Sequence, residues 1–108
     1  MAEIKFSPES IYDLKEIKKY ISDDLCNEIA ASATVIGIVN RIKELSAFPL
    51  IGASLSPVVK IETDYRYVVH KNYMVFYRYE NNTVFIVRVL YGKRNYIETL
   101  FGELPKEN

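Results

Sequence analysis

The stretch that most constrains the fold is residues 65–96, because turn residues divide it into short runs of strand-forming residues. These runs are rich in tyrosine, valine, phenylalanine and isoleucine, which favour β-structure. The turns fall at Lys71-Asn72 and Glu80-Asn81-Asn82, and adjacent asparagines tolerate the left-handed backbone of a tight hairpin. We therefore predict antiparallel strands over residues 65–70, 73–79 and 83–90. The last strand is apolar on both faces, which places it inside the sheet.

The first half of the chain predicts one strand followed by two helices. Glu3–Phe6 alternates polar and apolar residues, as a half-buried strand does. Ser7-Pro8-Glu9 then supplies a capping oxygen, a proline suited to the first helical turn, and an acid at the positive end of the helix dipole. This helix is expected to end near Ile21. A second is expected to run over residues 25–48, where Pro49 stops it.

The second predicted helix carries small residues that favour a close neighbour. Its alanines and Gly37 leave room for another helix, so the two helices are expected to form an antiparallel hairpin. One broad apolar face is expected along the second helix, made by Ile29, Ala30, Ala33, Ile36, Val39, Ile42 and Leu45.

The remaining segments complete the predicted fold. Residues 58–62 form a further candidate strand, and residues 95–101 form a short helix or an extended arm that ends in the bulky apolar pair Leu100-Phe101. The tail from Gly102 is expected to be loose. The order of elements predicts a single α+β domain over residues 1–108: an N-terminal strand, a helical hairpin, and a three- to four-stranded antiparallel sheet packed on the hairpin.

Composition limits the compartment and the chemistry. No apolar run reaches the roughly 18 to 20 residues of a membrane span, and the N-terminus has no signal-peptide core. The lone Cys26 fits a reducing compartment, so we expect a cytoplasmic protein without membrane contact. One histidine, His70, and one cysteine far apart in the sequence make no recognisable ligand set, and the four glycines are too scattered for a phosphate-binding loop. We therefore expect no metal and no cofactor.

Residues 65–96 also concentrate positive charge, because they carry six of the fourteen basic residues and one acid, Glu80. Arginines bind phosphate through paired hydrogen bonds and tyrosines stack on bases, so this group fits an acidic or phosphate-bearing partner such as RNA. A metal-free ribonuclease needs groups that activate the 2′-hydroxyl, stabilise charge on phosphorus and protonate the leaving oxygen. A structural interpretation stays open beside this one, since tyrosines form strands well and arginines extend from strand edges into water.

The order of these elements resembles the RelE/ParE superfamily of toxins from bacterial type II toxin–antitoxin systems, over nearly the whole chain. The resemblance rests on short pieces in a shared order: Ser7-Pro8-Glu9, Asp13-Leu14, Phe48-Pro49, Gly52, Arg66-Tyr67, residues 73–78 and 84–90, and Gly92-Lys93-Arg94-Asn95-Tyr96. It implies a small α+β toxin of the plasmid-stabilisation type. The surface of such a toxin is occupied by a cognate antitoxin until that partner is degraded.

Two activities occur in this superfamily. RelE-like members cut mRNA on the ribosome, whereas ParE-like members poison DNA gyrase and are not nucleases. RelE-like nucleases carry an arginine where this chain has Met74, and lysines where it has Tyr65 and Tyr67. The resemblance therefore favours the ParE branch and a growth-arresting gyrase inhibitor without enzymatic activity. Under the alternative of a ribosome-dependent mRNA endonuclease, the candidate catalytic residues are Arg94, Arg78, Arg88 and Tyr96.

The resemblance also implies partners and contact residues. The expected partners are a cognate antitoxin and DNA gyrase, or the ribosome and mRNA under the alternative. A third interpretation is an inactive module that binds only its antitoxin. A homodimer is a further expectation, because exposed apolar residues near the C-terminus would seek cover. The residues expected to contact the target are Lys93, Arg94, Tyr96, Leu100 and Phe101.

Overall fold

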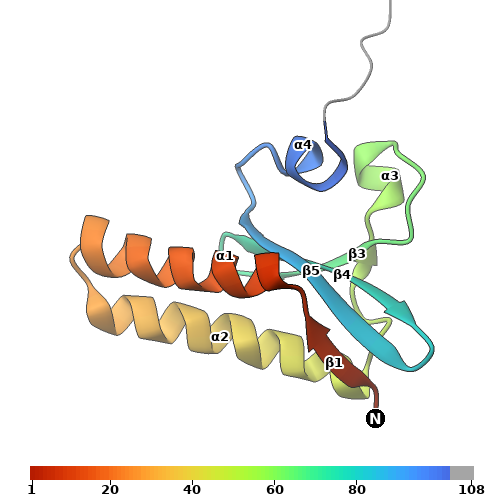
Figure 1. The fold of residues 1–108 in the computed structure, drawn as a ribbon, viewed down its shortest axis with the longest axis horizontal. Coiled ribbons are helices and arrows are strands. Elements are labelled where there is room, and N and C mark those ends of the chain that lie inside the picture. The colour runs from red at the N-terminus through yellow and green to blue at the C-terminus, as the bar shows by residue number, and fades with distance from the viewer. Residues whose placement is uncertain (103–108) are drawn as a thin grey trace, which may run out of the picture.

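The fold is a helical hairpin packed on a five-stranded mixed sheet, which confirms the predicted α+β class (Figure 1). The computed structural model describes residues 1–102, so the predicted loose tail lies outside the described residues except for Gly102. In chain order the elements are β1 (Glu3–Phe6), α1 (Pro8–Lys19), η1 (Tyr20–Asp24), α2 (Glu28–Ala47), β2 (Ala53–Ser54), α3 (Ser56–Val59), β3 (Arg66–His70), β4 (Tyr73–Glu80), β5 (Thr83–Tyr91) and α4 (Tyr96–Phe101).

The sheet has the order β1-β5-β4-β3-β2, so the apolar strand β5 lies inside it, as predicted. β1 runs parallel to β5, and the other pairs are antiparallel. The two predicted hairpin turns are confirmed, because Lys71, Asn81 and Asn82 have positive φ angles of 53°, 50° and 57°. In addition to the three consecutive antiparallel strands β3, β4 and β5, the sheet contains β1 at one edge and the two-residue β2 at the other.

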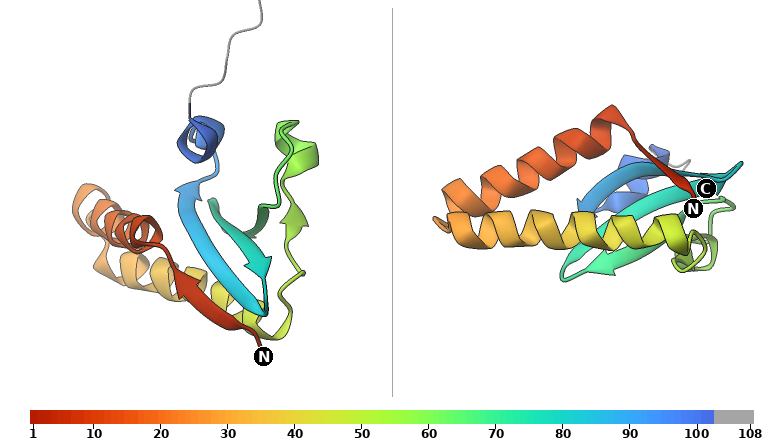
Figure 2. Two further views of the ribbon diagram at one scale, coloured as in Figure 1. Left: turned by 45° about the vertical axis from the view of Figure 1, so that its right-hand side comes forward. Right: turned by 90° about the horizontal axis from the view of Figure 1, so that it is seen from below.

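The two long helices, α1 and α2, begin where side-chain oxygens cap them. The Ser7 hydroxyl accepts a hydrogen bond from the Ser10 N–H at 3.0 Å, at the start of α1. The helical path continues beyond α1 as the π-helix η1, and α2 starts only at Glu28, where the Asn27 side chain accepts from the Ala30 N–H. The two helices form the predicted hairpin on one face of the sheet (Figure 2).

The predicted buried face of α2 was wrong in its first half. Ile29 is 85% exposed and Ile36 is 59% exposed, whereas Ala31 and Thr34 are buried. The reason is steric: α2 packs closely on η1 here, and small residues permit that approach while the larger isoleucines point outward. The expected role of Gly37 was also wrong, because this glycine faces a strand residue: a Cβ there would lie 2.2 Å from His70 Nε2.

The strand predicted over residues 58–62 is wrong as well, because the chain forms the short helix α3 there. Pro57 sits in the first turn, where its fixed φ suits a helix. Lys60 then adopts a left-handed conformation with φ 58° and ends the helix. The Ser56 hydroxyl donates to the Ile61 carbonyl at 2.9 Å, which closes this loop on itself.

Two apolar cores lie on opposite faces of the sheet, because successive strand residues point to opposite sides. The helix-side core includes Val75 and Tyr77 of β4, packed with residues of both hairpin helices. The second core includes Phe76, which lies between Val75 and Tyr77 in the sequence. Residues of α3 and α4 cover this core. Figure 2 (left) shows α3 and α4 away from the hairpin. A bulge between Phe76 and Tyr77 marks the point where the pairing with β5 shifts.

Tyr77 ties the connection after α2 to the sheet. Its side chain is fully buried, and its hydroxyl donates to the Pro49 carbonyl at 2.7 Å and accepts from the Gly52 N–H at 3.0 Å. Burial raises the pKa of the Tyr77 phenol, so it stays protonated and remains a donor. Both backbone groups would otherwise be unpaired.

We predict that Tyr77→Phe lowers the free energy of unfolding by about 1 to 3 kcal/mol, because it leaves two backbone groups without a partner. The matched control is Tyr79→Phe in the same strand, since Tyr79 also packs on the helix-side core but its hydroxyl makes no hydrogen bond within residues 1–102. Urea unfolding of both variants tests this. Equal stability of the two variants would contradict the anchoring role of Tyr77.

Candidate functional site

The site begins where β5 loses its strand neighbour. β1 pairs with β5 only as far as Phe6 opposite Ile86, so the following residues of β5 have no strand on that side. α1 takes the place of a strand there. The Ser7 hydroxyl donates to the Val87 carbonyl at 2.7 Å, and the Asp13 carboxylate accepts from the Val89 N–H at 3.0 Å.

Asp13 also binds Arg88 through two hydrogen bonds of 2.7 and 2.8 Å, a paired geometry that suits a guanidinium and a carboxylate. The Asp13 residue is only 6% exposed. Hydrogen bonding to Asp13 raises the pKa of Arg88, and burial opposes this shift. The charge of Arg88 is therefore committed to holding α1 against β5.

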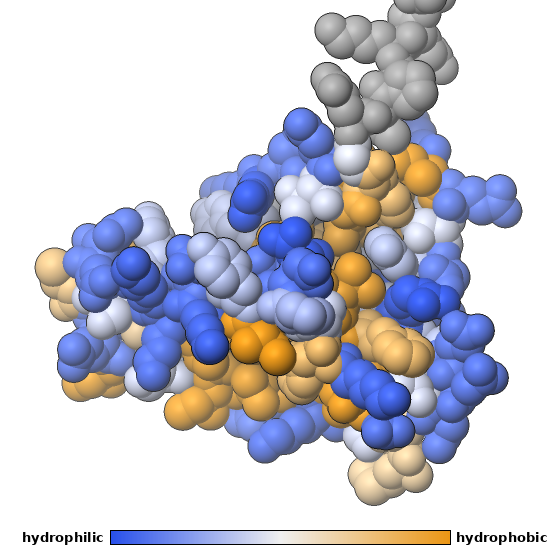
Figure 3. All heavy atoms as spheres, in the orientation of Figure 1, coloured by the Kyte–Doolittle hydropathy of each residue, from blue (hydrophilic) through white to orange (hydrophobic). Residues whose placement is uncertain are grey.

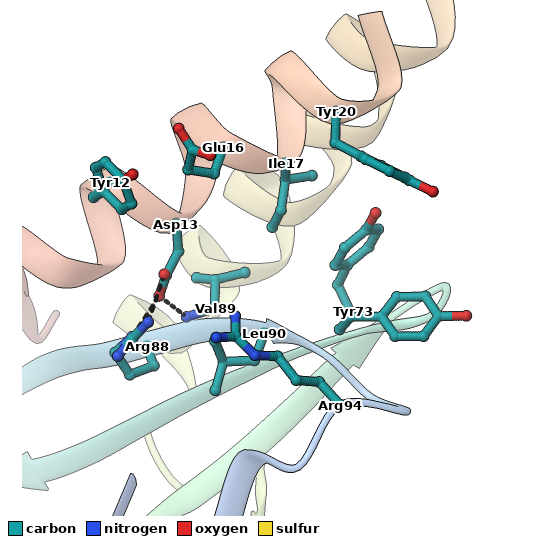
Figure 4. Close-up of a pocket in the computed structure, with 11 residues that line it drawn as sticks. Tyr12, Asp13, Glu16, Ile17, Tyr20, Tyr73, Arg88, Val89, Leu90 and Arg94 are labelled. Atoms are coloured by element: carbon teal, nitrogen blue, oxygen red, sulfur yellow. Dashed lines mark hydrogen bonds and ion pairs between the residues drawn. The ribbon is translucent and has the colours of Figure 1, made fainter. Parts of the chain in front are cut away.

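Beside this ion pair lies a cleft of about 730 Å³ between α1 and the ends of β4 and β5, which we call the Arg94 cleft (Figure 4). Three buried apolar residues, Ile17, Val89 and Leu90, lie behind it. Arg94 reaches back from the loop after β5 toward Val89, inside the cleft (Figure 4). Glu16 adds one carboxylate, and the aromatic residues that line the cleft are Tyr12, Tyr20, Tyr73 and Tyr91.

Of the tyrosines that line the cleft, Tyr12, Tyr20 and Tyr91 are exposed and Tyr73 is half-buried. Burial raises the pKa of Tyr73, and the neighbouring phenols of Tyr20 and Tyr91 raise it further. Tyr73 is thus a neutral hydrogen-bond donor at physiological pH. Its ring contacts that of Tyr91 edge-to-face, with the centroids 5.8 Å apart. The cleft therefore offers flat aromatic faces, phenolic hydroxyls, the carboxylate of Glu16 and the cation of Arg94, which is unpaired within residues 1–102.

The three candidate arginines differ in what they bind. Arg88 is paired with Asp13, and Arg78 is bonded to Asp64 at 3.1 Å and to Glu80 at 2.9 Å. The hydrogen bond to Asp64 leads the interactions that raise the pKa of Arg78. Arg94 makes no ion pair within residues 1–102. Among these arginines, Arg94 is thus the one whose charge is available to a partner.

The structure separates the residues that the sequence grouped at the C-terminal end. Lys93 and Arg94 are exposed in the loop, but Tyr96 packs against Phe76 in the second core, with ring centroids 5.2 Å apart. Phe101 stacks on Tyr65 at 5.6 Å, and Leu100 belongs to the same core. The apolar pair Leu100-Phe101 is therefore half-buried by the chain itself.

Sequence reasoning missed the contribution of α1 and of Tyr20, the first residue of η1. One wall of the cleft is lined by Tyr12, Glu16 and Tyr20. Each follows the previous one by four residues, and this spacing places all three on one side of a helix. That spacing was visible in the sequence, but nothing in it indicated that this side faces the end of β5.

The described residues contain no group of three or more histidine, cysteine, aspartate or glutamate side chains that could hold a metal ion. In the same part of the chain, no helix is long and apolar enough to cross a membrane.

Comparison with known proteins connects this chain to a family. A family model described as the ParE toxin of the type II toxin-antitoxin system, parDE, matches residues 4–96. The fold is similar to a solved structure described as a chromosomal ParDE TA system from P. aeruginosa, with a TM-score of 0.70 and 20% sequence identity. The similarity covers 84% of this chain and 96% of that chain. No curated protein sequence matches the chain.

We predict that Asp13→Ala lowers the free energy of unfolding by about 3 kcal/mol. The substitution leaves the partly buried Arg88 guanidinium and the Val89 N–H without their hydrogen-bond acceptor. The control is Glu44→Ala, which breaks the exposed Arg41–Glu44 pair on α2 and should cost less than about 0.5 kcal/mol. Urea unfolding measures both values. A similar small loss in the two variants would show that the Asp13 carboxylate does not hold the edge of β5.

Proposed function

The chain belongs to the ParE toxin family of type II toxin–antitoxin systems, and on that premise we propose that it arrests growth by binding and poisoning DNA gyrase. We further propose that a cognate antitoxin neutralises it by covering the Arg94 cleft. The proposed place of action is the cytoplasm, where gyrase works.

The observation that supports gyrase binding over mRNA cleavage is that three of the four candidate catalytic residues already have other partners within this chain, which leaves only Arg94 free. Arg88 is held by Asp13, Arg78 by two carboxylates, and Tyr96 by packing on Phe76. Cleavage of RNA without a metal needs several free groups around one phosphate. Met74, which stands where RelE-like nucleases have an arginine, supports the same choice.

We propose Lys93 and Arg94 as the residues that contact the target directly. Both are exposed, and Arg94 points into a cleft lined by tyrosine rings, which fits an acidic side chain flanked by apolar ones. Tyr96, Leu100 and Phe101 then act indirectly: by packing in the second core, they hold α4 and the loop that carries the two cations.

An antitoxin segment of matching chemistry would be an amphipathic helix with an acidic residue on its apolar side. Such a helix can lay its apolar face on the rings of Tyr20, Tyr73 and Tyr91 while its carboxylate meets Arg94. Covering the cleft in this way would hide the residues proposed for the target. The gene beside the one for this chain should encode a short protein with that pattern.

The direct test uses purified protein, gyrase and plasmid DNA. We expect inhibition of supercoiling and a trapped cleavage complex, both reversed by the antitoxin. Primer extension on mRNA after induced expression should show no codon-phased cuts. Intact gyrase activity at excess toxin would refute the proposal, and codon-phased cuts would support the nuclease alternative in its place. Normal growth on expression without the antitoxin would indicate an inactive binding module.

We predict that Arg94→Glu raises the concentration needed for half-inhibition of gyrase about tenfold or more, which corresponds to about 1.4 kcal/mol of binding free energy. The matched control is Lys15→Glu, the same reversal at an exposed position of α1 that does not line the cleft. Supercoiling assays over a range of toxin concentrations compare the two. Loss of inhibition in both variants would point to a general charge effect instead.

A further inference from the structure

One charge in the Arg94 cleft is not used by the fold. Four charged side chains line the cleft, and two of them, Asp13 and Arg88, pair with each other. The other two are Glu16 on α1 and Arg94 on the loop after β5, and neither makes an ion pair within residues 1–102. The cleft therefore presents an unpaired carboxylate on one wall and an unpaired guanidinium on the other.

Tyr12 stands beside the carboxylate of Glu16. It precedes Glu16 by four residues, a spacing that places the two side chains next to each other on the surface of a helix. Figure 4 shows both on α1, with Tyr20 farther along the same wall. Tyr12 is 62% exposed. An antitoxin helix whose apolar face lies on Tyr20, Tyr73 and Tyr91 would therefore leave the ring of Tyr12 available for a further contact.

The other charges of α1 leave Glu16 free to bind a cation. Lys19 follows it by three residues but makes no ion pair with it within residues 1–102. The remaining lysines of this helix, which do not line the cleft, are Lys15 and Lys18. Glu9 precedes Glu16 by seven residues, two turns along the same side, and adds negative charge. In Figure 3, hydrophilic side chains gather over α1, above the apolar ones over α2. On the loop wall the sign is reversed, because Lys93 is exposed next to Arg94.

We propose that Glu16 and Tyr12 bind an arginine of the antitoxin, on the edge of its helix opposite the acid that meets Arg94. A guanidinium binds a carboxylate through its edge and stacks on an aromatic ring through its face, a combination that suits arginine better than lysine. A helix in a cleft meets one wall along each of its long edges, so walls of opposite sign fit one basic and one acidic edge. This inference rests on the proposed neutralisation by an antitoxin helix and adds a second charged contact in the same cleft.

The charge pair fixes the direction in which the antitoxin helix runs. A helix that runs the opposite way can keep its apolar face on the tyrosine rings, but its two edges change places. Its acid then meets Glu16 and its arginine meets Arg94, so like charges face each other at both walls. Glu16 thus determines specificity together with Arg94, because an antitoxin with the opposite arrangement of edges is repelled.

The first test measures binding of the purified antitoxin, the protein encoded by the neighbouring gene, by isothermal titration calorimetry. Glu16→Arg should raise the dissociation constant about tenfold or more, because it sets two guanidinium groups against each other. The matched control is Glu62→Arg, the same reversal at an exposed position that does not line the cleft, and it should leave the dissociation constant unchanged. Urea unfolding confirms that both variants fold.

Equal dissociation constants for Glu16→Arg and the unmodified chain overturn the proposal. If Glu16→Arg weakens gyrase inhibition but not antitoxin binding, the α1 wall contacts the target, which also overturns it. An antitoxin that does not bind the unmodified chain contradicts the proposed neutralisation itself, and this contact with it.

The second test identifies the partner residue by rescue. Each arginine and lysine of the antitoxin helix is changed in turn to glutamate, and its binding is measured with the unmodified chain and with Glu16→Arg. One arginine-to-glutamate change should weaken binding to the unmodified chain and restore binding to Glu16→Arg, a coupling that a merely structural role of Glu16 would not produce. If no change restores binding, or if only a change at a lysine does, the arginine contact is overturned.

The third test concerns the ring of Tyr12. Tyr12→Leu should raise the dissociation constant about threefold, in the range of an exposed contact between a cation and an aromatic ring. Tyr12→Phe keeps the ring and should bind the antitoxin as the unmodified chain does. The same loss in both variants would show that the hydroxyl group makes the contact, which would overturn the stacking of the guanidinium on the ring.

Discussion

The arrangement of the whole molecule depends on one carboxylate at an unpartnered strand edge. β1 covers β5 only as far as Ile86, and Asp13 of α1 then accepts the Val89 N–H together with two hydrogen bonds from Arg88. A buried N–H without a partner is costly, so α1 must lie along this edge, with Asp13 turned toward it. The position of the hairpin on the sheet, and the cleft beside α1, follow from that requirement.

The loop that carries Lys93 and Arg94 is held from both ends. The Gly92 N–H donates to the Asn72 carbonyl at 2.7 Å, and the Arg94 N–H donates to the Tyr91 carbonyl at 3.0 Å, so the loop continues the hairpin geometry. Beyond it, α4 is fixed by the packing of Tyr96 on Phe76. A cation on a backbone that is already ordered loses less conformational entropy on binding, which favours recognition at this end of the sheet.

Local sequence patterns predicted those parts of the fold that local chemistry decides. The capping Ser7 and the paired asparagines were sufficient for α1 and for the β4–β5 turn. The buried side of the first half of α2 was not predictable from the sequence. This helix has apolar residues on two sides, and only the close packing of η1 determines that the side with Ala31 is the buried one. The cleft was missed for a similar reason, since it forms only where α1 meets strand ends some 60 to 80 residues later.

Charge shows most clearly how tertiary structure changes a sequence interpretation. Residues 65–96 carry six basic residues, but Arg88 and Arg78 meet acids that lie outside this stretch, Asp13 and Asp64. The Arg66 guanidinium donates to the backbone carbonyl of Gly52 at 2.7 Å. Arg94 is thus the main free positive charge in the cleft, with Glu16 across from it, and Lys93 is exposed next to it in the loop. Nucleic acids are bound through many phosphate contacts, so two cations beside apolar and aromatic walls favour a protein partner with a single well-placed acid.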